Sequence, residues 1–375
     1  MKICILTFDY PPRPVYGSGV YVDHLTKLLR AADHVVEIIT VNRFGLICEE
    51  DAIFCDCTCS HKALEKGKCV CSFGHMGCFP GLLEKALKRF EKDDFSPDVI
   101  YVNGYMFFDL ALALKARYMS AKLISAIHFM VEQNEVNEDD PERISIYNEE
   151  SRMISSSDEI IYFGELAYKL IQRRSICDMG KLHLIPHSYN VEICRRKFNG
   201  NHRFAYVGRI EHGKGIEHLC EAFARLDQTF TFDIIGTGRL YSSIKEKYGH
   251  IFNVYGYKNK SFVLEKLKSA DFFLLPSFSE QCPVVVLEGM ACGCIPILSN
   301  FGSLPDMLEE TSSGILIDIE REYELFVGNI ADAIKMALQI SDTQANEMIL
   351  TNYYLLQRYF SPKKMLDQTL AVFKL

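Results

Sequence analysis

The sequence has no hydrophobic run long enough to span a membrane, and Met1-Lys2-Ile3 leads into a strand-like segment instead of a signal peptide. It also has no excess of basic residues, because 41 Lys and Arg stand against 49 Asp and Glu, for a net charge of −8. A globally basic domain is typical of nucleic-acid binders, so nucleic acid is excluded as an expected partner. These absences predict a cytoplasmic globular protein.

A Cys-x-x-Cys zinc knuckle is also absent, although the chain has 14 cysteines, seven of them in the segment from Cys48 to Cys78. Without a secretion signal we expect reduced thiols rather than disulfides. Alternating cysteines in this segment would share one face of two short strands and offer ligands to a tetrahedral zinc ion. They are Cys55, Cys57, Cys59, Cys69 and Cys71. Because the knuckle spacing is missing, we expect an insertion without metal, and a structural metal site is the alternative.

Strand patterns alternate with helical patterns along most of the 375 residues, which is typical of an α/β protein with parallel sheets and enough length for two domains. Residues 190–202 lack periodicity and read as a linker. The predicted strands are 2–8, 35–41, 98–103, 122–127, 157–162, 182–185, 203–207, 230–235, 254–257, 271–275 and 295–298. A helical tail is predicted over 330–375, with a break at Ser361-Pro362.

One strand–turn–helix unit runs from Asp271 to Gly293. Pro283 suits the first helical turn, and Gly293 suits the position just past the helix end. The N–H groups of Val284 and Val285 would then point out of the helix start and favour an anion.

Two carboxylates bracket that helix start, Glu280 in the preceding turn and Glu288 within the helix. An anion site flanked by carboxylates that accept hydrogen bonds from hydroxyl groups suits a sugar diphosphate. For this unit alone, two solvated glutamates are the simpler interpretation.

Two cations, Arg209 and Lys214, follow the strand 203–207 on a glycine-bearing turn. Such a pair can hold a diphosphate from two sides, with Arg as a fork and Lys as a point charge. A second glycine turn, Gly236-Thr237-Gly238, follows the strand 230–235.

The first strand is followed by Gly17-Ser18-Gly19, and helical spacing begins at Val20. This turn lets a ligand approach the backbone, but it is not the dinucleotide fingerprint, because Val22 stands where the third glycine should be. His128 ends the strand 122–127, where ligands bind in open α/β sheets. The alternative is that His128 makes its hydrogen bonds within its own loop and does not bind a ligand.

The segment Leu82–Phe90 is an amphipathic helix with three basic residues. We expect its apolar stripe to pack on the first sheet. Peripheral association with an anionic membrane surface, on the cytoplasmic face, is the alternative. Residues 132–142 are acidic and are expected to form a solvated loop or helix face.

Four motifs occur together in one order: Tyr10-Pro11-Pro12 with Gly17-x-Gly19, Gly208-Arg209-Ile210 with Lys214-Gly215, Gly236-Thr237-Gly238, and Pro276-Ser277 with Glu280 and Glu288. By these motifs the chain resembles a retaining family 4 glycosyltransferase of GT-B fold, over nearly its whole length. The resemblance implies two facing doubly wound Rossmann-like domains: an acceptor-binding domain over 1–189 with the insertion 48–78, and a nucleotide-sugar-binding domain over 190–355. A final helix, 356–375, would return to the first domain.

The resemblance also implies roles for individual residues. Glu280 would bind the donor sugar and Glu288 the ribose, while His128 would face the anomeric carbon. Positive charge for the leaving diphosphate would come from Arg209 and Lys214. The remaining donor-binding residues implied are Gly17, Ser18, Gly19, Gly236, Tyr257, Cys282, Pro283, Val284 and Val285.

By the same resemblance the donor is a UDP-, GDP- or ADP-sugar and the acceptor a glycan, a lipid or a small molecule. Because fixed cations can replace the divalent metal of other transferases, no metal cofactor is expected. Two departures stand out: Pro186-His187-Ser188-Tyr189-Asn190 where the family usually has Pro-Asn-Gly-Val-Asp, and Gly289 where alanine is common. A nucleotide-sugar isomerase or phosphorylase on the same fold, and a non-catalytic sensor of sugar nucleotides or metal, remain open alternatives.

Overall fold

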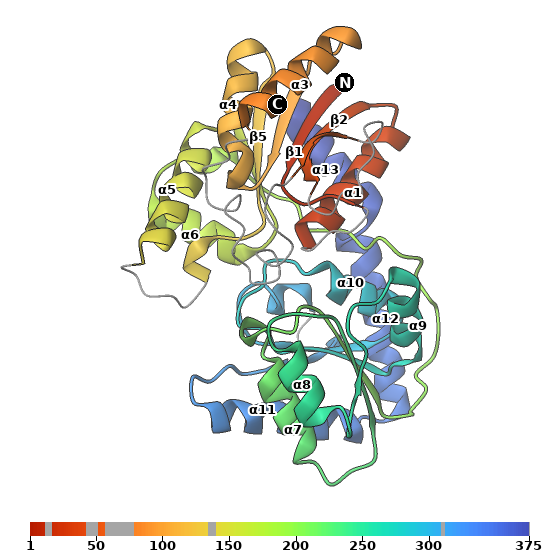
Figure 1. Cartoon of the computed structure of the whole chain (residues 1–375). Coiled ribbons are helices and arrows are strands. Elements are labelled where there is room, and N and C mark those ends of the chain that lie inside the picture. The colour runs from red at the N-terminus through yellow and green to blue at the C-terminus, as the bar shows by residue number, and fades with distance from the viewer. Residues whose placement is uncertain (12–16, 43–51, 57–78, 134–139, 309–311, 375) are drawn as a thin grey trace. The chain divides into compact units, whose positions relative to one another are not determined.

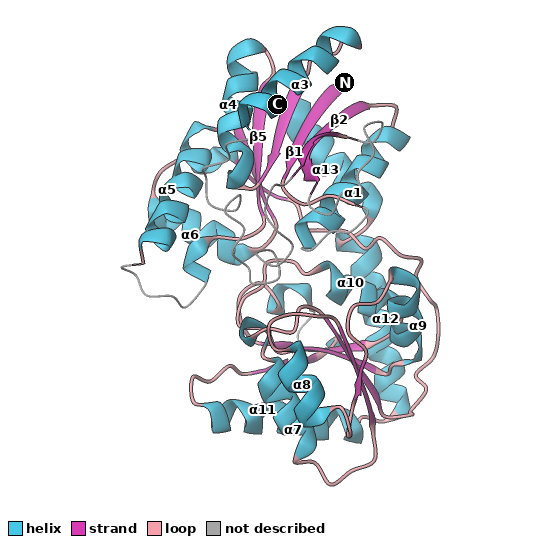
Figure 2. Cartoon of the chain, viewed as in Figure 1, coloured by secondary structure: helices cyan, strands magenta, loops and turns pink. Residues whose placement is uncertain are grey.

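The structure is a computed structural model that describes residues 1–11, 17–42, 52–56, 79–133, 140–308 and 312–374. The chain forms two compact units, one of Met1–Ile185 with Met365–Leu375, the other of Pro186–Lys364. Each unit is built on a parallel sheet flanked by helices (Figure 1, Figure 2). The predicted α/β architecture with two doubly wound sheets is confirmed.

The first sheet has the strand order β3-β2-β1-β4-β5-β6-β7, and its order reverses between β1 and β4. Its strands are β1 Lys2–Thr7, β2 Val35–Asn42, β3 Ile53–Asp56, β4 Val99–Asn103, β5 Lys122–Ile127, β6 Glu159–Tyr162 and β7 Leu182–Leu184. All residues of β4 are buried, as expected where helices cover both faces of a parallel sheet. The continuous apolar runs in the sequence form the buried strands at the centre of this sheet.

Among the described residues, the helices that belong wholly or mainly to the first unit are α1 Gly17–Ala31, α3 Phe79–Lys92, α4 Phe108–Arg117, α5 Pro141–Ser156, α6 Glu165–Arg174 and α13 Pro362–Lys374. The last of these comes from the C-terminus. The ring of its Phe373 lies 5.8 Å from the ring of Tyr101 in β4. The C-terminal helix therefore returns to the N-terminal unit, as the resemblance implied.

The second sheet has the order β10-β9-β8-β11-β12-β13, with its reversal between β8 and β11. Its strands are β8 Arg203–Val207, β9 Thr231–Ile235, β10 Asn253–Val254, β11 Phe272–Leu275, β12 Ile295–Ser299 and β13 Ile315–Ile317. Its helices are α7 Ile216–Ala224, α8 Tyr241–Tyr248, α9 Lys260–Ser269, α10 Val284–Ala291, α11 Tyr323–Gln339 and α12 Asp342–Tyr359. Because β8 and β11 are neighbours, the loops that follow them meet at one edge of the sheet.

Two local expectations were wrong. The C-terminal helical tail is interrupted at Ile340-Ser341 as well as at Ser361, because Ser341 caps α12 by accepting a hydrogen bond from the Gln344 N–H. The first helix begins at Gly17 instead of Val20, so Gly17-Ser18-Gly19 is its first turn and not the turn before it. Of the acidic segment 132–142, residues 134–139 lie outside the described residues, and Asp140 caps a regular helix, α5.

The cysteine-rich segment is described only in part. Cys55 belongs to β3, while Cys57, Cys59, Cys69 and Cys71 lie outside the described residues, and the zinc alternative lies there with them. Among the described residues, no group of three or more His, Cys, Asp or Glu side chains is placed to hold a metal ion.

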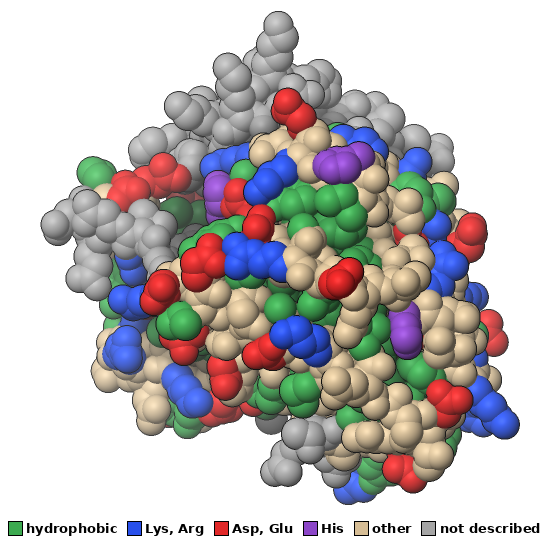
Figure 3. Space-filling view, turned by 90° about the horizontal axis from the view of Figure 1, so that it is seen from below, with side chains coloured by type: hydrophobic (Ala, Val, Ile, Leu, Met, Phe, Trp, Pro, Cys, Tyr) green, Lys and Arg blue, Asp and Glu red, His purple; other side chains and the backbone are tan. Residues whose placement is uncertain are grey.

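No helix in the described part is long and apolar enough to cross a membrane. The face shown in Figure 3 carries acidic and basic side chains interspersed with each other.

Candidate active site

The start of α10 is the centre of the candidate site in the second unit. Pro283 has extended backbone, with φ −68° and ψ 117°, and is the residue before the helix, not in its first turn as predicted. The Val286 N–H donates to Pro283 O at 3.0 Å. Val284 and Val285 precede it, so their N–H groups open the helix and can receive an anion. Gly293, with φ +83°, ends the segment as expected.

Lys214 and Glu280 form an ion pair at the edge where β8 and β11 end. Their side chains are only 18% and 13% exposed. Two hydrogen bonds hold their loops together: the Phe278 N–H donates to Gly213 O at 3.0 Å, and Ser277 Oγ to the same oxygen at 3.1 Å. The predicted cation and the predicted sugar-binding carboxylate are thus adjacent, although 66 residues separate them.

Arg209 lies in the same loop as Lys214 and is more exposed. Its Nη1 donates to Glu211 Oε2 at 2.5 Å, and its carbonyl oxygen accepts a hydrogen bond from the Tyr206 hydroxyl at 2.6 Å. Glu211 is a partner of Arg209 that is not among the residues predicted for the site. Lys214 and Arg209 are each paired with a carboxylate, so two cations are held on this loop at little electrostatic cost.

Two glycines, Gly215 and Gly236, allow the loops at this edge to pack backbone on backbone. A Cβ on Gly236, whose φ is +145°, would lie 1.8 Å from Gly208 O. A Cβ on Gly215, with φ +65°, would lie 2.1 Å from Pro276 O. Only glycine fits either position, because other residues would meet a carbonyl oxygen and a strained φ together. These contacts fix the loops after β8, β9 and β11 relative to each other.

Glu288 is buried in α10, and its carboxylate pairs with Lys260 Nζ at the start of α9. Burial raises the pKa of Glu288, and the charge of Lys260 opposes that rise. Lys260 was missed by the sequence analysis. No local pattern points to it, since 28 residues separate it from Glu288. Tyr257, three residues earlier in the chain, is 54% exposed.

Cys282 is buried immediately before Pro283. Burial raises the pKa of its thiol to about 12. The thiol is therefore neutral at physiological pH and is not a nucleophile there.

In the first unit, His128 ends β5 beside the carboxyl ends of β1 and β4. Asn103 Nδ2 donates to Thr7 Oγ1 at 3.1 Å, so Asn103 Oδ1 is the acceptor that lies 2.5 Å from His128 Nε2. The His128 ring stacks on Phe163 with centroids 4.2 Å apart. When the ring is neutral, Nε2 carries the proton and Nδ1 is an acceptor. Asn103, a polar residue that ends a buried strand, was also missed.

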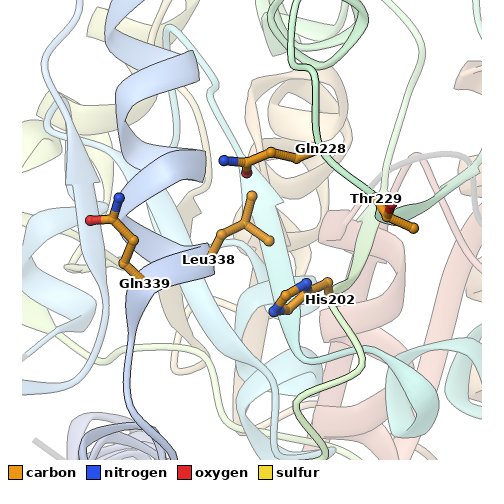
Figure 4. Close-up of a pocket in the computed structure, with 5 residues that line it drawn as sticks. All are labelled: His202, Gln228, Thr229, Leu338 and Gln339. Atoms are coloured by element: carbon orange, nitrogen blue, oxygen red, sulfur yellow. The ribbon is translucent and has the colours of Figure 1, made fainter.

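A pocket of about 300 Å³ lies elsewhere in the second unit. Its lining residues are His202, Gln228, Thr229, Leu338 and Gln339 (Figure 4). His202 and Thr229 precede β8 and β9, so the pocket is at the amino ends of these strands. Ligands of open α/β sheets bind at the opposite, carboxyl ends. The ion pairs and the start of α10 therefore identify the candidate site better than this pocket does.

Solved structures share this fold. Sucrose-phosphate synthase from Thermosynechococcus elongatus matches with a TM-score of 0.80 at 18% identity, covering 100% of this chain and 98% of its own. Anabaena HepE in complex with UDP and glucose matches with a TM-score of 0.72 at 15% identity, covering 100% and 99%. The fold is that of the GT-B glycosyltransferases.

Two family descriptions match successive parts of the chain. Glycosyltransferase Family 4 matches residues 15–193 and Glycosyl transferases group 1 matches residues 195–348. The chain belongs to the group 1 glycosyltransferases of the family 4 type.

The curated relatives differ in the share of their own length that this chain matches. Glycogen synthase from Mycobacterium tuberculosis H37Rv is 24% identical over 343 residues, which is 84% of this chain and 82% of its own. Glycogen synthase from Aquifex aeolicus is 31% identical over 115 residues, which is 29% of this chain and 24% of its own.

Proposed function

We propose that the protein is a retaining, metal-independent transferase that moves a hexosyl group from a nucleotide sugar to an acceptor during glycan or glycoconjugate synthesis. The observation that carries the proposal is the Lys214–Glu280 ion pair beside the open N–H groups of α10. The second unit, in this proposal, binds the donor and the first unit binds the acceptor.

The chemistry of the residues supports this assignment. In the transition state of the transfer, the sugar gains cationic character and the departing diphosphate gains negative charge. Arg209, Lys214 and the N–H groups of Val284 and Val285 stabilise that charge from fixed positions, which lowers the barrier. Glu280 accepts hydrogen bonds from the sugar hydroxyls, and Glu288 from those of the ribose.

His128 is proposed to face the anomeric carbon, with its ring oriented by the hydrogen bond between Nε2 and Asn103 Oδ1 and by the stacking on Phe163. Gly17, Ser18 and Gly19, at the start of α1, are proposed to bind the phosphates through their backbone. In the same proposal Gly236, Tyr257 and Cys282 complete the donor site.

The nucleotide is proposed from relatives. HepE has been captured with UDP and glucose, and glycogen synthases are among the curated relatives. We therefore expect UDP- or ADP-glucose as the first donors to test, with GDP-glucose as the third. An α-glucan and a lipid-linked saccharide are the first two acceptors to test.

A ligand screen tests the proposal. UDP, ADP and GDP at 100 times their dissociation constants should stabilise the folded protein by roughly 2.7 kcal/mol, which raises its melting temperature. No stabilisation by any nucleotide at millimolar concentration would contradict donor binding. Transfer in EDTA should equal transfer in Mg²⁺, and loss of activity in EDTA that Mg²⁺ or Mn²⁺ restores would contradict metal independence. Proton NMR of the first product should show the anomeric configuration of the donor.

A further inference from the structure

Glu288 is a buried carboxylate that has to be ionised if it is to accept hydrogen bonds from two hydroxyl groups of a ribose. A protonated carboxyl group uses one oxygen as a donor and loses acceptor capacity. Its side chain is 8% exposed, and burial favours the protonated form. The site therefore needs a group that keeps Glu288 charged.

Lys260 is placed to do this. Its Nζ contacts Glu288 Oε1 and donates to Asn190 Oδ1 at 3.3 Å, so the ammonium group is held between α10 and the segment that precedes β8. Asn190 is neutral, and the charge of Lys260 therefore acts on one carboxylate. Because Lys260 contacts Oε1, Glu288 Oε2 stays available as an acceptor for a ligand.

We propose that Lys260 is a positioning residue of the donor site, which orients the Glu288 carboxylate and keeps it ionised so that it binds the nucleotide ribose. The inference rests on the proposed function, because it takes Glu288 as the ribose ligand. Lys260 does not touch the reacting atoms, and its effect is on nucleotide affinity rather than on the chemical step.

Other titratable groups around Glu288 do not replace Lys260. The elements packed on α10 are α9, α12, β11 and β12. Cys292, at the end of α10, is buried with a pKa raised to about 11, and burial also raises the pKa of the Tyr353 phenol in α12. Both are neutral between pH 5 and 9, and Lys268, later in α9, acts on Cys292. Among the described residues, Lys260 is the charged group that acts on Glu288.

The test is the dissociation constant of UDP, and of ADP in parallel, measured by calorimetry between pH 5.5 and 8.5. Lys260→Met should bind the nucleotide about tenfold more weakly than wild type at pH 7.5, because the carboxylate loses a charge-assisted hydrogen bond. Its loss of affinity on acidification should begin about one pH unit higher, because the pKa of Glu288 rises without Lys260. Lys260→Arg should restore most of the affinity.

Lys258→Met is the matched control, since Lys258 is exposed two residues earlier and lies 5.1 Å from the Phe262 ring. It should behave as wild type. In a Glu288→Gln background, Lys260→Met should cause no further loss, because the two residues act as one unit. With the acceptor substrate present, the KM for the donor should rise in Lys260→Met while kcat changes little.

Three outcomes would overturn the inference. Wild-type affinity in Glu288→Gln would remove the ribose assignment, and the inference with it. Weak binding in Glu288→Gln together with an unchanged affinity and pH profile in Lys260→Met would leave the ribose assignment and remove Lys260 alone. A lower melting temperature in Lys260→Met, with the pH profile of binding unmoved, would make the ion pair a packing contact between α9 and α10.

Discussion

The two sheets have the same doubly wound topology, yet their carboxyl edges are built differently. In the second unit, loops after three strands pack backbone on backbone through Gly215 and Gly236, and the charged side chains are paired across them. In the first unit, the edge is organised by side chains, with His128 between Asn103 and Phe163. The carboxyl edge of the second sheet therefore depends on short glycine and charge motifs. The carboxyl edge of the first sheet depends on contacts between side chains that are distant in the sequence.

The largest expected effect concerns the paired charges at the carboxyl edge of the second sheet. Lys214→Met should lower kcat by about 10²- to 10³-fold, because one fixed positive group aimed at the leaving diphosphate is lost. Steady-state kinetics with a saturating donor measure this. Lys335→Met is a control, since Lys335 pairs with Asp332 on the surface of α11. A turnover within twofold of wild type in Lys214→Met would remove Lys214 from the catalytic role.

The second prediction compares glycines at the two edges. Gly236→Ala should lower the free energy of unfolding by about 3 kcal/mol or more, because the new Cβ meets a carbonyl oxygen at a strained φ. Gly17→Ala, where a Cβ meets nothing within 4 Å, should change it little or raise it by up to about 1 kcal/mol.

Chemical denaturation of the two variants measures both glycine effects, with Gly213→Ala as a control, since a Cβ there also meets nothing within 4 Å. Equal destabilisation by Gly17→Ala and Gly236→Ala would show that the two edges do not differ in this way. A higher donor KM in a fully folded Gly17→Ala would support backbone contact with the donor.

The smallest expected effect concerns a buried charge cluster in the first unit. Arg174 is shared by two carboxylates, Glu132 and Glu150, and its side chain is 1% exposed. Glu150 also accepts hydrogen bonds from the Val131 N–H at 3.2 Å, which holds the segment that follows His128. Burial raises the pKa of Glu150 to about 7, more than Arg174 lowers it.

A carboxyl group whose pKa is higher in the folded state stabilises that state most below its ordinary pKa, and the contribution is lost as pH rises towards the folded value. Glu150 should therefore favour the folded state less at pH 7.5 than at pH 5. Glu150→Gln should reduce the difference in melting temperature between these pH values by a few degrees, whereas Glu149→Gln, on the same helix, should leave it unchanged. An unchanged difference in Glu150→Gln would contradict the raised pKa.

Much of the second edge could be predicted from the sequence, because its parts lie in neighbouring strand–loop–helix units. Lys214 and Glu280 follow β8 and β11, and parallel strands that pair bring the loops after them together. The break before α12 was also readable, since Ser341 and Gln344 have the spacing of a capping box. The cap was overlooked because the apolar periodicity on both sides of it is helical.

Other parts could not be predicted. The Lys260–Glu288 pair depends on how α9 packs against α10, and hydrophobic periodicity reports which face of a helix is buried but not which residue of the next helix faces it. The Asn103–His128 contact depends in the same way on the register of β4 and β5. Both contacts join side chains that no local spacing connects.

The sequence by itself determined the parallel α/β class and the positions of the glycine turns after β8 and β9, because strand period, turn chemistry and φ preference are properties of short segments. Only the tertiary structure decided that Lys260 pairs with Glu288, since the packing of distant elements selects the partner of a buried charged group.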